Sequence, residues 1–141
     1  MMNYRKELGI LILVTVFILS AGYLIIHQES IGLCLGIESN CSNTIMYSLG
    51  KPLFYGFFYP LVILITLVFF SEKIYLSWKK FSKWCFPIFV TLVLVSKPLC
   101  SSIICLDRTE TSILLGKIFF GLSLLIIIGK SLQLWHKKRK G

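Results

Sequence analysis

Four of the five cysteines fall in two short segments between apolar runs, and their paired spacing suits disulfide or redox chemistry. Cys34 and Cys41 are separated by seven positions, and Cys100 and Cys105 by five. In an oxidising compartment such pairs favour disulfides, which need a turn that brings the two alpha carbons to about 4.4 to 6.8 Å. Pairing within each segment and pairing between the segments both remain open. Cys85 lies in an apolar run and is interpreted as a small buried side chain.

Three lysines form the second set of candidate residues, because each lies near one end of a long apolar run. They are Lys51, Lys97 and Lys117. An ammonium group inside a bilayer is costly unless its side chain reaches the interface or finds an acidic partner. We expect these side chains to reach the interface; an anion or headgroup site and the lining of an oligomeric pore are the alternative roles. The acidic residues available there are Glu29, Glu38, Asp107 and Glu110.

Other enzyme chemistry finds no support in the sequence. His27 and His136 each stand alone, without a second ligand at metal-binding spacing, so no metal site is predicted. The chain has no phosphate-binding glycine loop and no nucleophile elbow, and we expect no cofactor and no catalytic residue. Because no carboxylate pair lies inside an apolar run, a proton-coupled transporter is disfavoured.

Four apolar runs must position these residues, and they cover approximately residues 8–27, 52–71, 84–104 and 112–133. Each is long enough to cross a hydrocarbon core of about 30 Å as a helix. Charged residues make up 15% of the chain, against about a quarter in soluble domains. The sequence therefore predicts an all-α polytopic membrane protein, with a four-transmembrane-helix bundle that forms one integral membrane domain over residues 1–141. A β-barrel is disfavoured because its strands would alternate over about ten residues.

Positive charge is unequal on the two sides of these runs. Eleven of the fifteen Lys and Arg residues lie before the first run, between the second and the third, or at the end of the fourth run and beyond it. Because cationic flanks stay cytoplasmic, both termini are predicted to be cytoplasmic and both cysteine segments periplasmic or extracellular. Anionic headgroups at the inner face account for this charge, so no nucleic acid partner is expected. The small size and short loops favour a bacterial inner membrane. Cleavage of the first run as a signal peptide is an alternative that its length disfavours.

The segment 72–83 is predicted to form a short amphipathic helix on the inner membrane surface. Ile74, Trp78 and Phe81 recur at three- and four-residue spacing, and lysines project from the opposite face. All three tryptophans lie at this inner boundary, where an indole finds both water and hydrocarbon. We interpret them as interface anchors, with the docking of a cytoplasmic partner as the alternative. These residues are Trp78, Trp84 and Trp135.

Two outer cysteine pairs on four membrane helices resemble the arrangement in the quinone-coupled disulfide-forming membrane proteins and, more loosely, in the vitamin K epoxide reductase family. The resemblance implies periplasmic thiol-disulfide chemistry at Cys34, Cys41, Cys100 and Cys105. Those families use a Cys-x-x-Cys pair, whose close spacing tunes the thiolate pKa and the redox potential. This chain contains no such pair, so structural disulfides are the preferred interpretation.

The two halves of the chain show a weak internal similarity. Leu33-Cys34 and Leu99-Cys100 are separated by the same distance along the chain as Leu49-Gly50-Lys51 and Leu115-Gly116-Lys117. This indicates a duplicated helical hairpin as one possible origin of the bundle. No four-residue glycine repeat marks a tight helix pair.

Three functions from different classes remain open on these observations. The preferred one is a small non-catalytic inner-membrane protein that acts by contact with a protein partner, as a subunit of a membrane complex or as an immunity or defence protein. The second is a homo-oligomeric pore or holin-like channel. The third is periplasmic thiol-disulfide redox chemistry.

Overall fold

The computed structural model describes residues 4–27, 46–97 and 107–139, and this part of the chain is helical with short turns and contains no strand. Helix α1 spans Tyr4–Ile26, and the π-helical turn η1 (Met46–Gly50) leads directly into α3 (Lys51–Val68). Helix α4 spans Glu72–Val95, and α5 spans Arg108–Arg139. The all-α prediction is therefore confirmed for the described residues.

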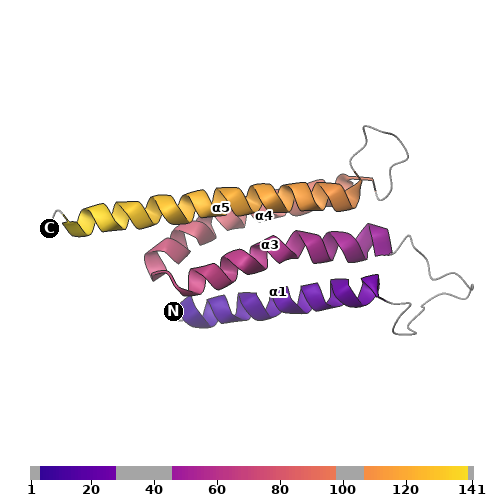
Figure 1. Cartoon of the computed structure of the whole chain (residues 1–141), viewed down its shortest axis with the longest axis horizontal. Coiled ribbons are helices and arrows are strands. Elements are labelled where there is room, and N and C mark those ends of the chain that lie inside the picture. The colour runs from indigo at the N-terminus through magenta and orange to yellow at the C-terminus, as the bar shows by residue number, and fades with distance from the viewer. Residues whose placement is uncertain (1–3, 28–45, 98–106, 140–141) are drawn as a thin grey trace, which may run out of the picture.

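The helices run antiparallel in chain order, so both chain ends lie at the same end of the bundle (Figure 1). We call this the terminal end; it also holds the turn between α3 and α4. The opposite end, where α1 and α4 finish and α3 and α5 start, is the loop end. Helix α3 packs between α1 and α5, and α4 packs on α5, whereas the backbones of α3 and α4 come close at few positions.

Three helical stretches are long and apolar enough to cross a membrane, namely Tyr4–Ile26, Ser48–Val68 and Arg108–Arg139. The chain is therefore a membrane protein with three candidate spans in its described part. Helix α4 is 24 residues long but is not among them, because Lys79, Lys80 and Lys83 interrupt its first half. The predicted third span also extends to residue 104, and residues 98–106 lie outside the described part of the chain.

Helix α4 joins two segments that the sequence separates. The predicted amphipathic helix at 72–83 continues without a break into the predicted third span, through Pro87. Its apolar face packs onto protein: Ile74, Tyr75 and Trp78 are buried, while its lysines are exposed. The apolar face of this segment therefore packs against α1, α3 and α5, and its place at the membrane surface stays a prediction.

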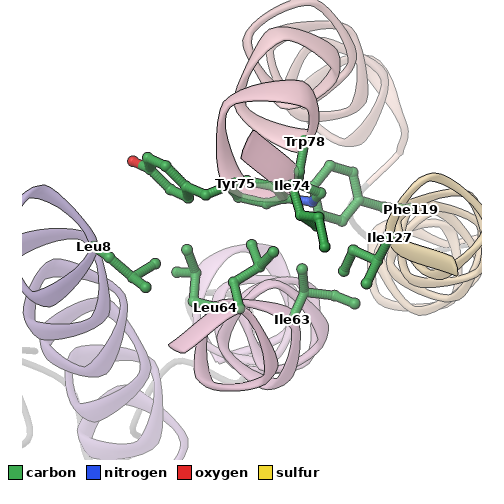
Figure 2. Close-up of a cluster of buried hydrophobic side chains, with 9 residues drawn as sticks. Leu8, Ile63, Leu64, Ile74, Tyr75, Trp78, Phe119 and Ile127 are labelled. Atoms are coloured by element: carbon green, nitrogen blue, oxygen red, sulfur yellow. The ribbon is translucent and has the colours of Figure 1, made fainter. Parts of the chain in front are cut away.

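The core lies toward the terminal end and draws on all four helices (Figure 2). In Figure 2, residues from α4 lie over Ile63 and Leu64 of α3, with Leu8 of α1 on one side and Ile127 of α5 on the other. Lipid tails are as apolar as these side chains, so close packing stabilises such a core more than exclusion of water does. The core residues are Leu8, Ile63, Leu64, Leu67, Ile74, Tyr75, Trp78, Phe119 and Ile127.

Helices α3 and α5 approach closely where small residues face each other. A Cβ added at Gly56 would lie 2.6 Å from Ser112 Oγ, and one added at Gly116 would lie 2.5 Å from Tyr59 Cδ2. Ser112 Oγ also donates a hydrogen bond of 2.8 Å to the Pro52 carbonyl across this contact. Small residues and a buried hydroxyl are typical of membrane helix interfaces, and here they hold the two helices together without a glycine repeat.

Candidate functional site

The structure leaves the predicted disulfides untested. Cys34, Cys41, Cys100 and Cys105 all lie outside the described residues, so both pairing schemes stay predictions. Cys85 is half-buried on α4, carries a free thiol and packs against the core cluster.

The three predicted lysines lie at two different depths. Lys51 is the first residue of α3 and Lys97 follows the end of α4, so both are at the loop end. Lys117 lies on α5 nine residues after Arg108, which places it about 13 Å along the helix at 1.5 Å per residue. Its side chain is exposed, and no group in the described part of the chain bonds to its ammonium.

The three tryptophans that were predicted to be interface anchors differ in their exposure. Trp78 is 4% exposed, and its indole Nε1 donates a hydrogen bond of 3.0 Å to Ser123 Oγ on α5. It is a packing residue of the core, and its role as an interface anchor stays a prediction. Trp84 is 78% exposed, and Trp135 is exposed beneath the Arg139 guanidinium, 4.7 Å from the ring centre.

At the terminal end a charged contact joins two helices. Lys79 of α4 forms an ion pair with Glu7 of α1. Next to it the rings of Tyr4 and Tyr75 lie 6.1 Å apart, and the buried Tyr75 hydroxyl has no hydrogen-bond partner among the described groups.

Toward the loop end α3 and α4 diverge and leave an apolar groove between them, with α5 as its floor. This α3/α4 groove has a volume of about 110 Å³. Four phenylalanines form its deeper part: the ring centroids of Phe57 and Phe86 are 5.5 Å apart, and those of Phe86 and Phe89 lie 6.2 and 6.0 Å from Phe119. The polar residues that line it are Ser48, Arg108 and Ser112.

Arg108 closes the loop end of this groove by binding backbone carbonyls. Its Nη1 donates to the Ser48 carbonyl at 3.1 Å, and its Nη2 donates to the carbonyls of Leu94 and Ser96 at 3.1 and 3.0 Å. Nε also donates to Ser96 at 3.3 Å, and the Arg108 amide donates to the Lys97 carbonyl at 2.8 Å. The guanidinium thus caps the negative C-terminal end of α4 and ties it to the turn before α3.

No acidic side chain in the described ranges pairs with this guanidinium. Its bonds use four of the five guanidinium donors, which leaves one Nη1 hydrogen and the full positive charge at the mouth of an apolar groove. The neighbouring Asp107 carboxylate instead accepts the Glu110 amide at 2.7 Å, as the N-cap of α5.

The sequence predicted neither the groove nor the role of Arg108, which is one of the four Lys and Arg residues outside the cationic flanks. One local signal was available: Asp107 and Glu110 are three positions apart just before an apolar run, a spacing typical of a helix N-terminus. That signal places Arg108 on the first turn of α5. It does not reveal the carbonyls that Arg108 binds, because they come from residues distant in the sequence.

The described residues contain no group of three His, Cys, Asp or Glu side chains arranged to hold a metal ion. A scan against protein-family models and searches of curated proteins and solved structures each found no match to this chain. Function therefore has to be inferred from the chain's own geometry and charge.

Proposed function

We propose that this chain is a non-catalytic membrane protein that acts by contact, and that the exposed face of α5 around Lys117 binds a membrane helix of a partner protein. One observation carries the proposal: a lysine without a partner in the described structure projects from a helix long enough to span a bilayer. The preferred class is a subunit of a membrane complex or an immunity protein.

The depth of Lys117 makes its charge expensive. Arg108 and Lys130 are 22 residues apart on α5, or about 33 Å, which matches a hydrocarbon core of about 30 Å. With Arg108 at one boundary and Lys130 at the other, Lys117 starts about 13 Å below the nearer boundary. Its side chain leans toward the start of the helix, which shortens this depth only in part. A lysine at the bilayer centre costs about 2.5 to 3.5 kcal/mol, and a partner carboxylate would relieve that cost.

The shape of the surrounding surface suits a helix. Gly121 lies one turn after Lys117, and a Cβ built there meets nothing within 4 Å. The exposed side chains of Leu114, Ile118 and Leu125 flank this position on the same face. A partner backbone can approach closely at Gly121 while an Asp or Glu on that partner reaches Lys117. The chemistry required of the partner is therefore a membrane-spanning helix with an acidic side chain in the outer half of the bilayer.

We infer further that all four helices are embedded, with the terminal end at the cytoplasmic face of a bacterial inner membrane. Most exposed cations of α1, α4 and α5 lie toward the terminal end, which supports this orientation under the positive-inside rule, whereas Lys83 and Lys117 lie near the middle of their helices. The cations toward the terminal end are Arg5, Lys6, Lys73, Lys79, Lys80, Lys130, Lys137, Lys138 and Arg139. Helix α4 would enter from this face through its lysine-bearing half and cross beside α5 with its apolar half.

Cysteine accessibility in whole cells tests this orientation. In a chain with its five cysteines replaced by serine, Lys97→Cys at the loop end should react with a membrane-impermeant maleimide from outside. Ser77→Cys, on the partly exposed side of α4 near the terminal end, should react only after permeabilisation. The reverse pattern, or outside labelling of both, contradicts the proposed topology.

Photo-crosslinking in the native membrane tests the partner. A photoreactive amino acid at Ile118 should capture a protein in the wild-type background and with Lys117→Arg, but lose it with Lys117→Leu. Lys130→Leu is the matched control, because it removes an exposed lysine from the same helix outside the proposed site. The identified protein must carry a membrane-embedded acid, and changing that acid to lysine should restore capture by Lys117→Asp. Adducts only with lipid or with a second copy of this chain contradict the proposal.

A further inference from the structure

We propose that the α3/α4 groove binds one anionic phospholipid, with its phosphate at Arg108 and part of one acyl chain between α3 and α4. This site is separate from the α5 face at Lys117 and goes beyond the contact function proposed above. The ligand class follows from three properties of the groove: its length, its width and the charge at its mouth.

The length of the groove matches one leaflet. Its lining on α5 extends from Arg108 to Phe119, eleven residues or about 16 Å along the helix axis. Half of a hydrocarbon core is about 15 Å. The groove therefore runs from the headgroup level to the middle of the bilayer, which is the depth that an acyl chain occupies.

The width of the groove excludes a protein helix. A helix with side chains is about 10 to 12 Å across, far more than a cavity of about 110 Å³ admits. A single hydrocarbon chain needs only a narrow slot with apolar walls. The walls fit this requirement, because Ser112 Oγ is already bonded to the Pro52 carbonyl and Ser48 lies at the mouth beside Arg108. Nothing polar in the deeper part of the slot demands a hydrogen bond from the occupant.

The mouth of the groove favours a negative headgroup. Arg108 keeps one Nη1 hydrogen without a partner and bonds to no carboxylate among the described residues, and guanidinium groups bind phosphate with strong, charge-assisted hydrogen bonds. Lys97 is exposed beside it, since its carbonyl accepts the Arg108 amide. The Asp107 carboxylate at the N-cap of α5 and the exposed Glu110 are nearby negative charges that oppose an anion, so the preference rests on the guanidinium that lines the groove. A headgroup with a net negative charge is therefore favoured over a zwitterionic one, whose cation faces the same guanidinium.

Native mass spectrometry of the full chain in delipidated detergent micelles tests the site. Phosphatidylglycerol is titrated against phosphatidylcholine with matched chains. Both lipids offer Arg108 a phosphate, but the choline ammonium of phosphatidylcholine opposes the guanidinium charge, so we expect one phosphatidylglycerol to bind at least about tenfold more tightly. Arg108→Gln should remove most of this preference, and Arg108→Lys should keep part of it. Equal binding of the two lipids by the wild-type chain overturns the proposal.

Two further arms keep the test decisive if Arg108→Gln fails to fold. Val90→Phe fills the groove without touching the charge, and it should weaken phosphatidylglycerol binding about tenfold or more. Leu13→Phe is its control, because it adds bulk at an exposed position of α1 that lines neither the groove nor the α5 face. Unchanged binding by Val90→Phe contradicts the acyl-chain site. Displacement of the lipid by millimolar inorganic phosphate would show a free-anion site instead and also overturn the proposal. Neither arm changes Lys117, so its outcome is independent of the partner crosslink.

Discussion

The terminal and loop halves of the bundle are built from the same helices but are closed by different means. In the terminal half, large side chains of α4 fill the space between the other three helices, and Trp78 bonds directly to Ser123. In the loop half, α4 presents Val90 and Val93 toward α3, and a groove remains. The bundle is therefore solid where α4 fills the space between the other helices and hollow where α3 and α4 diverge.

The hydrogen bonds that join the helices also differ between the two halves. In the terminal half the bond between helices joins two side chains, so its strength depends on both residue types. In the loop half Arg108 holds backbone carbonyls, which are present whatever residues occupy those positions. The contact in the terminal half therefore requires two particular side chains, whereas the contacts in the loop half require only Arg108.

The largest expected effect comes from the solid half. Trp78→Ala removes the largest core side chain and leaves Ser123 Oγ unpaired, so it should lower the free energy of unfolding by about 3 to 5 kcal/mol. Unfolding by sodium dodecyl sulfate in mixed micelles measures it. Trp84→Ala is the matched control and should change stability little, because that indole is exposed. Equal losses for both variants would contradict the buried position of Trp78.

The next effect distinguishes the two halves directly. Arg108→Ala leaves the carbonyls of Ser48, Leu94 and Ser96 without this donor, and we expect a loss of about 2 to 3 kcal/mol. Hydrogen exchange should rise at the last turn of α4 and stay unchanged around Tyr75. Lys97→Ala is the control, since its side chain is exposed and makes none of these hydrogen bonds to backbone carbonyls. Faster exchange throughout α4 would mean that the two halves unfold as one unit.

A smaller effect is expected where α3 meets α5. Gly116→Ala places a methyl group 2.5 Å from Tyr59 Cδ2, so the ring must rotate away at a cost of about 1 to 3 kcal/mol. Gly121→Ala on the same helix meets no atom and should be neutral or stabilise the helix by about 0.5 to 1 kcal/mol. Opposite signs in detergent unfolding support the packed interface, and matching signs argue against it.

The smallest effect belongs to the ion pair at the terminal end. Glu7→Gln removes the charge that Lys79 meets, but both groups are partly exposed to solvent. Such pairs contribute about 0 to 1 kcal/mol, and salt screens them. We expect stability at low salt to fall by less than 1 kcal/mol and the difference to vanish at high salt. A loss larger than that of Gly116→Ala would show that the pair is buried in the membrane.

The sequence predicted the helices far better than their assembly. Its runs at 52–71 and 112–133 correspond to α3 and α5, since uninterrupted apolar residues over that length leave few alternatives. The amphipathic pattern at 72–83 was also visible, but periodicity does not tell whether an apolar face meets lipid or protein. The inward turn of Trp78 could be found only in three dimensions.

The candidate site was predictable only in part. Lys117 is found by composition alone, because any lysine within an apolar run stands out. Arg108 is not, because its acceptors are main-chain atoms up to 60 positions away, and such atoms leave no trace in residue types. The groove cannot be predicted from the sequence either, because it forms where α3 and α4 diverge in three dimensions.

The hydrogen bond from Trp78 to Ser123 also constrains the order of biosynthesis, because the two residues are 45 positions apart. A ribosome adds about 5 to 20 residues per second, so the indole emerges roughly 2 to 9 s before its acceptor. During that interval α1 and α3 can already pair, while Trp78 of α4 still lacks its packing partner on α5. Nascent chains that stop before Ser123 should therefore be held by the insertion machinery or degraded, whereas chains that stop just after the last turn of α5 should not.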